Sequence, residues 1–286
     1  MPVRKALMFM LISATAFAFL SISVKSLIHL GSFELVFFRC LGTSILANIY
    51  LRSQKISPFG NERRLLIYRS VSGLIAMSMF YLSLNYLAVG TSVALRYTSP
   101  IFATFFAVLF LKERVKHIQW LFFLISFSGV LVMKGFDPNI NTTGFIIIMF
   151  TAIFSGLAYI SIRKIGNRDH PVVIVNYFMT FGAVVSGFIA IPMWVQPQGS
   201  EWILAGSLGV IGFVAQYFMT RAFQIAHTYV VAPMKYVEMV FTVLLGMMLL
   251  GERYSIYSFL GALLIVGGLL LNIRFSTVGA SKKKSI

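Results

Sequence analysis

Long apolar runs, separated by short polar or turn-forming segments, make up most of the chain. Each run is about as long as a helix that crosses a hydrocarbon core of roughly 30 Å, and each is bounded by charged residues or by Gly, Pro, Asn or Asp. The pattern therefore predicts ten transmembrane helices. We place them near residues 6–28, 33–51, 66–87, 91–111, 118–133, 144–162, 172–195, 203–222, 228–250 and 256–273.

The first run also resembles a secretory signal peptide, because it follows Arg4 and Lys5 and contains spaced alanines. Its apolar stretch is long for a signal peptide, and nine further runs follow it. We therefore expect it to be kept as the first transmembrane helix.

Composition supports a membrane protein. Of 286 residues, 58% are hydrophobic and 11% are charged, with a mean hydropathy of +0.87. Soluble domains carry about a quarter of their residues as charges, so this chain is too apolar to be one. The 24 Lys and Arg against 8 Asp and Glu give a net charge of +16, which on a soluble chain would suggest a nucleic-acid partner.

The positions of the basic residues give that charge a different meaning. Cytoplasmic loops of membrane proteins are enriched in Lys and Arg. If the N-terminus is cytoplasmic, most of the basic residues of this chain fall in such loops, so no nucleic-acid partner is expected. Only Lys134 and Arg253 fall in the opposite loops. We predict a multi-pass protein of the cell inner membrane with lipids as neighbours and both termini in the cytoplasm. The basic residues on the predicted cytoplasmic side are Arg4, Lys5, Arg52, Lys55, Arg63, Arg64, Lys112, Arg114, Lys116, Arg163, Lys164, Arg168, Arg274, Lys282, Lys283 and Lys284.

The chain also aligns with itself. A shift of 139 residues superimposes the fourth and fifth predicted helices on the ninth and tenth, and a shift of 138 aligns the first with the sixth. We infer two homologous five-helix repeats, 1–134 and 144–274, followed by a basic tail, 275–286. Because five is odd, the second repeat must be inverted, an arrangement that suits alternating access to a site at the midplane. Among the matched positions are Tyr97 and Tyr236, Glu113 and Glu252, Arg114 and Arg253, and the basic pair Arg96 and Lys235.

These features together resemble the EamA family of the drug/metabolite transporter superfamily. The resemblance rests on the ten spans, the duplication, the segment from Ser99-Pro100 to Glu113-Arg114, and Leu250-Gly251-Glu252-Arg253. Lys112 stands where glycine is more usual in the family. Residues 37–39 and 97–100 are also similar to bacterial S-adenosylmethionine carriers, a substrate we do not adopt. The resemblance implies a secondary transporter, and in related plant phosphate translocators basic residues on the fourth and ninth helices hold the anion.

Six basic residues lie inside predicted spans, where an ionised group must find water, a headgroup or a partner. Lys25, Arg69 and Arg221 lie within about a turn of a span end, which favours snorkelling to the headgroups. Arg96 and Lys235 lie deeper, so we predict that they bind substrate; a structural ion pair with Glu238 is the alternative. Arg39 is a comparable candidate, whose alternative is a pair with Glu34.

Helix periodicity completes the predicted site. Lys235, Glu238 and Thr242 share one face of the ninth helix, and Arg96 and Ser99 share one face of the fourth. We expect these faces to line a central cavity, with Glu238, Ser99 and Thr242 in coupling or gating. Tyr97 and Tyr236 follow the two basic residues and are candidates for substrate contact, or else anchors at the membrane interface.

Common enzyme chemistry has no counterpart in the sequence. There is no phosphate-binding loop, no His-Glu-x-x-His and no Gly-x-Ser-x-Gly, so we predict neither ATP-driven transport nor an enzyme. The single cysteine, Cys40, and four scattered histidines indicate no disulfide framework, metal site or cofactor.

Net positive charge inside the membrane favours an anionic or zwitterionic small metabolite as the substrate. The predicted function is its secondary active transport by a monomer or homodimer. Export of amino acids or amphipathic compounds is the alternative within transport, and a membrane receptor or scaffold is the alternative outside it.

Overall fold

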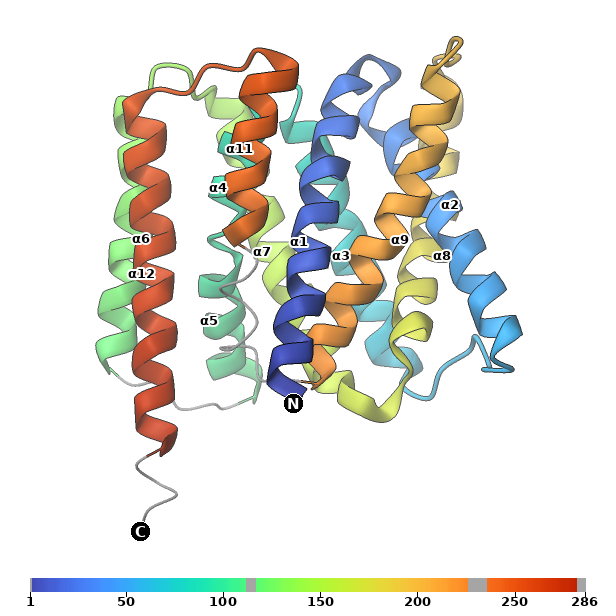
Figure 1. Cartoon of the computed structure of the whole chain (residues 1–286), viewed down its shortest axis with the longest axis horizontal. Helices are drawn as coiled ribbons and strands as arrows, with labels where there is room; N and C mark the ends of the chain where they lie inside the picture. Colours follow the sequence, from blue (N-terminus) through green and yellow to red (C-terminus); the bar gives the residue numbers. More distant parts are fainter. Residues whose placement is uncertain (1, 112–116, 226–235, 282–286) are drawn as a thin grey trace.

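The computed structural model describes residues 2–111, 117–225 and 236–281, and every regular element in those ranges is a helix (Figure 1). The first half contains α1 (Pro2–Ser26), α2 (Ser32–Ser53), α3 (Arg63–Ser83), α4 (Val89–Arg96), α5 (Ser99–Leu111) and α6 (His117–Phe136). The second half contains α7 (Thr142–Ile165), α8 (Pro171–Ala190), α9 (Glu201–Ile225), α11 (Tyr236–Leu250) and α12 (Ile256–Ser281). Short 3-10 turns cover Ile28–Leu30, Gly166–Arg168 and Ile191–Met193.

Local sequence signals set several helix ends. The side chain of Asn141 accepts hydrogen bonds from the backbone N–H groups of Thr143 and Gly144 and so caps the start of α7. Gly166, with a φ of +56°, ends the same helix. Pro171 occupies the first turn of α8, where its missing N–H costs no intrahelical hydrogen bond.

Seven helices are long and apolar enough to cross a membrane among the residues described. They cover Arg4–Ser26, Ser32–Ser53, Arg63–Ser83, Val89–Phe110, Thr142–Arg168, Pro171–Met193 and Glu201–Ala222. Three shorter apolar helices, Trp120–Phe136, Val237–Leu250 and Ile256–Gly268, fall where the fifth, ninth and tenth spans are predicted. The all-helical membrane architecture is confirmed, whereas the number of ten spans stays a prediction.

The predicted fourth helix, 91–111, is interrupted. It consists of α4 and α5, separated at Tyr97 and Thr98. The break has a local cause: Pro100 lacks the N–H that a continuous helix would bond to the carbonyl of Arg96. The hydroxyl of Thr98 donates to the carbonyl of Leu95 at 2.8 Å and occupies one acceptor at the break.

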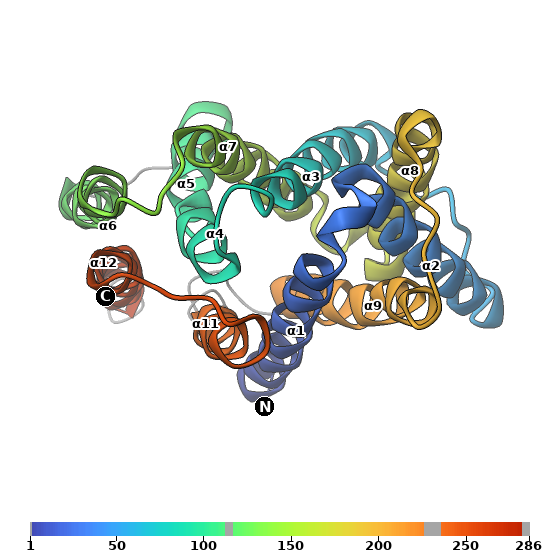
Figure 2. The ribbon, with the colours of Figure 1, turned by 90° about the horizontal axis from the view of Figure 1, so that it is seen from above.

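The two halves of the chain interleave, as Figure 2 shows from above. Helix α3 packs mainly against α7, and α1 packs mainly against α9. These two pairs are equivalent if α1 corresponds to α7 and α3 to α9, as the repeat requires. The pairs α2 with α8 and α6 with α12 each join equivalent helices of the two halves. Each half therefore completes the packing of the other.

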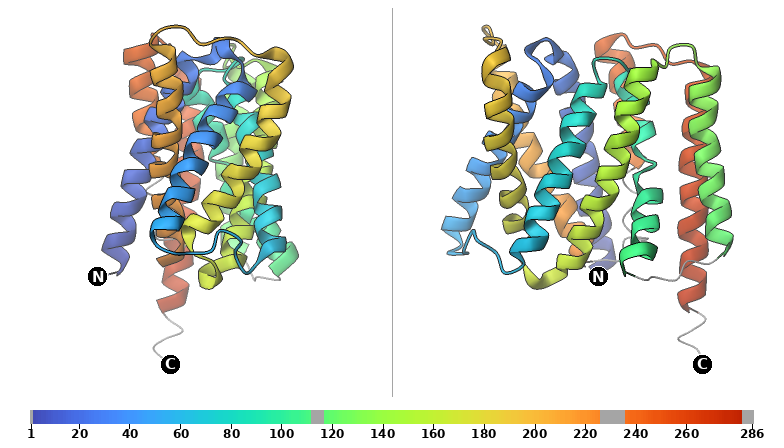
Figure 3. Two further views of the ribbon diagram at one scale, coloured as in Figure 1. Left: turned by 90° about the vertical axis from the view of Figure 1, so that its right-hand side faces the viewer. Right: turned by 180° about the vertical axis from the view of Figure 1, so that it is seen from behind.

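Helices α6 and α12 form a pair at one end of the molecule (Figures 2 and 3). Gly129 of α6 and Gly268 of α12, matched by the 139-residue shift, both lie in their interface. A Cβ at Gly268 would lie 2.6 Å from the carbonyl oxygen of Phe122. Small residues here let the two backbones approach closely, as is common between membrane helices.

The course of the chain fits an inverted repeat. Helix α1 begins and α12 ends at the same end of the bundle, and α7 begins at the opposite end and runs antiparallel to α1 (Figure 1). Equivalent helices of the two halves therefore point in opposite directions.

Candidate functional site

Arg96 and Glu238 form an ion pair between the two halves of the chain. Arg96 is the last residue of α4, and its Nη2 contacts the Oε1 of Glu238 in the first turn of α11. The Glu238 side chain is 1% exposed and that of Arg96 is 19% exposed. The guanidinium also lies 4.1 Å above the ring of Phe80. The predicted alternative of a structural ion pair with Glu238 is thus seen for Arg96.

Tyr97 belongs to the same group. Its hydroxyl donates a 2.9 Å hydrogen bond to the Oε2 of Glu238, and the side chain is buried. The interpretation of Tyr97 as an anchor at the membrane interface is therefore wrong. Tyr97 is the C-cap of α4, at the break between α4 and α5.

A cavity of about 90 Å³ lies beside the ion pair, and we call it the polar cavity. Its lining comes from α1, α2, α3, α4, α7, α8, α9 and α11, so both halves contribute. The charged residues that line it are Arg39, Arg69, Arg96 and Glu238; the uncharged polar ones are Thr151, Ser155, Tyr159 and Gln216; the aromatic rings include Phe17, Phe80 and Phe178.

Arg39 enters this cavity from α2. Its Nη1 donates a 3.1 Å hydrogen bond to the hydroxyl of Tyr81, and its guanidinium lies 5.6 Å from the ring centre of Phe17. The predicted alternative, a pair with Glu34, does not form, because Glu34 instead accepts a hydrogen bond from the backbone N–H of Val195. Arg39 is 6% exposed and thus faces the protein interior.

Arg69 also lines the polar cavity, and the expectation that it snorkels is wrong. It is 4% exposed, and its guanidinium stacks 4.2 Å above the ring of Phe178 on α8. Helix α3 begins at Arg63 and not near residue 66, so Arg69 lies six residues, or roughly 9 Å, inside the helix. The signal that could have revealed this is the Arg63-Arg64 pair, which marks the polar start of α3.

Lys25 has a structural role at a helix end. Its Nζ donates to the carbonyl oxygens of Leu84 and Leu87, which follow the last turn of α3. A basic side chain satisfies terminal carbonyls well, because the C-terminal end of a helix carries partial negative charge.

The remaining predicted site residues have different outcomes. Ser99 and Thr242 are buried, and neither lines the polar cavity. The Oγ1 of Thr242 has no hydrogen-bond partner among the described residues. Lys235 lies outside the described residues, and Tyr236 is described only as the first residue of α11.

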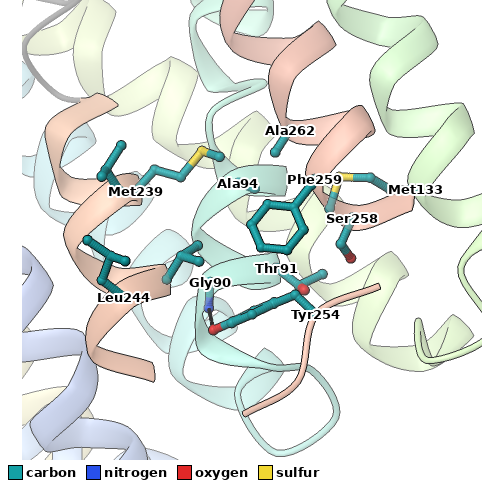
Figure 4. A pocket seen from close by; sticks show the side chains of 12 residues that line it. Gly90, Thr91, Ala94, Met133, Met239, Leu244, Tyr254, Ser258, Phe259 and Ala262 are labelled. Carbon is teal, nitrogen blue, oxygen red and sulfur yellow. Dashed lines mark hydrogen bonds between the residues drawn. The ribbon is translucent and has the colours of Figure 1, made fainter. Parts of the chain in front are cut away.

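A second cavity, of about 220 Å³, lies between α4, α6, α11 and α12, and we call it the apolar pocket (Figure 4). Residues of α4 that line it include Gly90, Thr91 and Ala94, and no charged side chain lines it among the residues described. Met133, Met239 and Phe259 supply much of the surface drawn in Figure 4.

The hydroxyl groups of Tyr254 and Ser258, at the edge of the apolar pocket, donate to carboxylates that do not line it. Tyr254 donates a 2.5 Å hydrogen bond to Oε2 of Glu252 and accepts one from the backbone N–H of Gly90. Burial first, and then the bond to Glu252, raise the pKa of Tyr254 above its ordinary value, so the phenol stays protonated. Ser258 donates its hydroxyl to Asp137. The cavity surface is therefore hydrocarbon in character.

Glu252 lies in the loop between α11 and α12 and joins the two halves. That loop is at the end of the bundle away from the termini (Figure 1). Both of its carboxylate oxygens accept hydrogen bonds from the backbone N–H of Val89, at 2.9 and 3.0 Å. The carboxylate thus sits at the N-terminus of α4, where the helix dipole favours negative charge. One of the two Glu-Arg motifs of the repeat therefore fixes the start of the helix that ends in Arg96.

The chemistry of these groups suits binding. Among the described residues, no three His, Cys, Asp or Glu side chains come together to hold a metal ion. Guanidinium groups against aromatic rings, with hydroxyl and amide groups nearby, can bind a carboxylate or phosphate by charge and by paired hydrogen bonds.

The sequence matches the model of the EamA-like transporter family twice, over residues 4–134 and 142–274. It is 27% identical over 256 residues to the pseudopaline exporter CntI of Pseudomonas aeruginosa, covering 87% of each chain. It is 24% identical over 257 residues to an S-adenosylmethionine uptake transporter of Rickettsia felis, covering 89% of this chain and 87% of that one.

The fold also matches a solved crystal structure. The TM-score is 0.72 at 16% sequence identity, and the match covers 95% of this chain and 99% of the other. At that identity the match supports the fold alone.

Proposed function

The chain belongs to the EamA-like transporter family, and we propose that it moves a small anionic or zwitterionic metabolite across the inner membrane by secondary active transport. Its relatives are named as transporters and not as enzymes. The proposed mechanism is alternating access, in which the interleaved inverted halves rock about a central site.

One observation carries this proposal: a buried ion pair between Arg96 and Glu238 joins the two halves beside the polar cavity. A charged pair inside a membrane protein is costly to bury, so it is expected where function needs it. A substrate that competes for Arg96 would weaken its bond to Glu238. Binding would in this way be coupled to the contact between α4 and α11.

Charge balance supports the choice of substrate class. The lining of the polar cavity contains three guanidinium groups, those of Arg39, Arg69 and Arg96, and one carboxylate, that of Glu238. The excess of two positive charges attracts an anion or the carboxylate of a zwitterion. Pseudopaline and S-adenosylmethionine are named as the substrates of the two relatives. For this chain we propose only a class of substrate.

We also propose that both termini face the cytoplasm. The end of α2 with Arg52, the loop with Lys55, the start of α3 at Arg63 and the turn Gly166–Arg168 lie at the same end of the bundle as the start of α1 and the end of α12 (Figure 1). Gathering basic residues at one end is what the positive-inside rule predicts for the cytoplasmic side.

The test has two steps. Purified protein is screened by thermal shift against carboxylates, phosphates, amino acids and nucleoside derivatives, because a ligand of the folded state raises the apparent melting temperature. Labelled forms of the compounds that stabilise it are then followed in counterflow with reconstituted wild type, Arg96→Ala and the exposed-site control Arg64→Ala.

We expect counterflow by wild type and by Arg64→Ala, and none by Arg96→Ala at equal protein incorporation. Wild-type rates from Arg96→Ala would remove Arg96 from the mechanism. If none of the stabilising compounds undergoes counterflow, the scaffold alternative replaces transport.

A second candidate function is the export of amphipathic compounds. The apolar pocket favours it, because a cavity of about 220 Å³ without a charged lining residue suits a hydrocarbon group. The thermal-shift screen separates the two candidates if it includes long-chain amines and amides beside the small anions.

A further inference from the structure

Two buried guanidinium groups in the polar cavity have donors that lack acceptors. The Nε of Arg39 and both the Nε and Nη1 of Arg69 are buried and make no hydrogen bond among the described residues. A buried ionised group without a partner destabilises a protein, so these donors indicate a missing acceptor. In contrast, Arg96 in the same cavity already pairs with Glu238.

The packing around Arg69 holds the guanidinium in place. A Cβ at Gly73, one turn further along α3, would collide with Nη1 of Arg69. Phe178 of α8 supports the other side, with its ring centre 4.2 Å from the guanidinium carbon. Because residue 73 is a glycine without a side chain, the guanidinium of Arg69 has room to lie there.

Arg39 is supported in a similar way. Gly212 of α9 borders it, and a Cβ there would lie 3.2 Å from Cγ and 3.3 Å from Nε of Arg39. The hydroxyl of Tyr81 fixes Nη1, which leaves Nε without a partner. Each arginine thus packs against a glycine, Arg39 against Gly212 and Arg69 against Gly73, and both line the same cavity.

We propose that Arg39 and Arg69 together form a subsite for a carboxylate group of the substrate, separate from the Arg96–Glu238 pair. The inference rests on the proposed transport function and narrows the substrate to a compound with a carboxylate. The planar fork of a guanidinium matches the two oxygens of a carboxylate. Aromatic rings lie beside both arginines, and they offer an apolar surface to the aliphatic part of such a compound.

The size of the cavity agrees with a small acidic group. The cavity has a volume of about 90 Å³, which is less than half that of the apolar pocket, about 220 Å³. The subsite therefore holds the head of a substrate, and propionate is a suitable probe. Propionamide has nearly the same shape without the charge and serves as its matched control compound.

The experiment measures the binding of propionate to purified full-length protein by thermal shift at constant ionic strength. Propionamide and inorganic phosphate are measured in parallel. The variants are Arg39→Gln, Arg69→Gln and Arg69→Lys, with Arg64→Gln as a control at an exposed position of the same helix as Arg69. Arg96→Gln tests the third guanidinium group that lines the cavity.

We expect propionate, and not propionamide, to stabilise wild type and Arg64→Gln. Arg39→Gln and Arg69→Gln should each raise the apparent Kd for propionate at least tenfold, because each removes a charged donor. Arg69→Lys keeps the charge and loses the fork, so its Kd should lie between those of wild type and Arg69→Gln. A folded Arg69→Lys also keeps the test valid if a glutamine variant fails to fold.

Three outcomes would overturn the subsite. One is that wild type binds no propionate. Another is that Arg96→Gln abolishes propionate binding while the Arg39 and Arg69 variants bind normally; transport of an anion through Arg96 would then stand without the subsite. The third is that phosphate stabilises the protein as strongly as propionate and with the same variant dependence, which would exclude selectivity for carboxylate.

Discussion

The polar cavity and the apolar pocket border the same short helix. Helix α4 contributes Gly90, Thr91 and Ala94 to the apolar pocket and Arg96 to the polar cavity. The two spaces nevertheless differ in kind, because the polar cavity keeps charged donors on its surface whereas the tyrosine and serine hydroxyls of the apolar pocket donate to carboxylates that do not line it. Ala94 and Arg96, two residues apart on this eight-residue helix, therefore border a site suited to hydrocarbon and one suited to anions.

The contacts at the two ends of α4 show where the two halves of the chain are joined. At the start of α4, Glu252 accepts from the backbone of Val89, and at its end Arg96 binds Glu238. Both carboxylates belong to the second half. Glu252 compensates the partial positive charge at the N-terminus of α4, and Glu238 compensates the charge of the Arg96 guanidinium. Helix α4 is thus held at each end by an acidic residue from the other half.

Removing the carboxylate of the central pair should have the largest effect. Glu238→Ala leaves Arg96 buried without its counter-charge and removes the hydrogen bond from the Tyr97 hydroxyl to Glu238, so we expect a loss of about 3–5 kcal/mol of folding free energy. The measurement is the apparent melting temperature in detergent, together with counterflow in vesicles, which should be lost.

The double variant Arg96→Met with Glu238→Met provides the control. It removes both charges at once, and we expect most of the stability to return while counterflow stays absent, because apolar pairs often replace buried ion pairs at little cost. Recovery of transport in the double variant would contradict a role of this pair in substrate binding.

A smaller effect is expected at the other end of α4. Glu252→Ala removes the acceptor of the Val89 N–H and the partner of Tyr254, and should cost about 1–2 kcal/mol, the upper part of the range for a helix cap. Glu252→Gln keeps one carbonyl oxygen as an acceptor and should lose less. Equal melting temperatures of Glu252→Ala and wild type would show that this contact does not fasten the halves.

Filling the apolar pocket should have the smallest effect. Ala262 of α12 is buried and lines the pocket, so Ala262→Val adds methyl groups to empty space and should stabilise the protein by about 0.5 kcal/mol. Counterflow of small anions should be unchanged. A loss of counterflow at normal stability would place the pocket on the transport path and break the distinction between the two cavities.

Much of the fold follows from the sequence because the membrane imposes strong rules. Apolar runs of sufficient length, turn residues between them and basic residues at one side predict the helices and the common end of the termini, and the structure agrees. The break at Tyr97 and Thr98 was harder to place. Proline at residue 100 is a local signal for it, but prolines are also common in uninterrupted membrane helices, so the proline alone does not predict a break.

The candidate site was predicted in part. Depth in a span and the repeat both pointed to Arg96, and helix spacing pointed to Glu238, which the structure brings together. The sequence offers Glu34, on the same helix, as a partner of Arg39, whereas the partner in the structure is Tyr81 of α3. Arg69 was missed because its depth depends on where α3 begins, and helix ends are the least certain part of a sequence pattern.

The interleaving of the halves has a consequence for biogenesis. Helix α1 has its main packing partner in α9, about 200 residues later in the chain. At a synthesis rate of about 5–20 residues per second, α1 waits roughly 10–40 s in the bilayer before α9 has been made. During that interval Ser13, which in the finished protein donates its hydroxyl to the carbonyl of Ala215, has to be accommodated without this partner. The order of synthesis thus differs from the order of packing. Helix α1 is made first but can acquire its main packing partner only after α9 has been made.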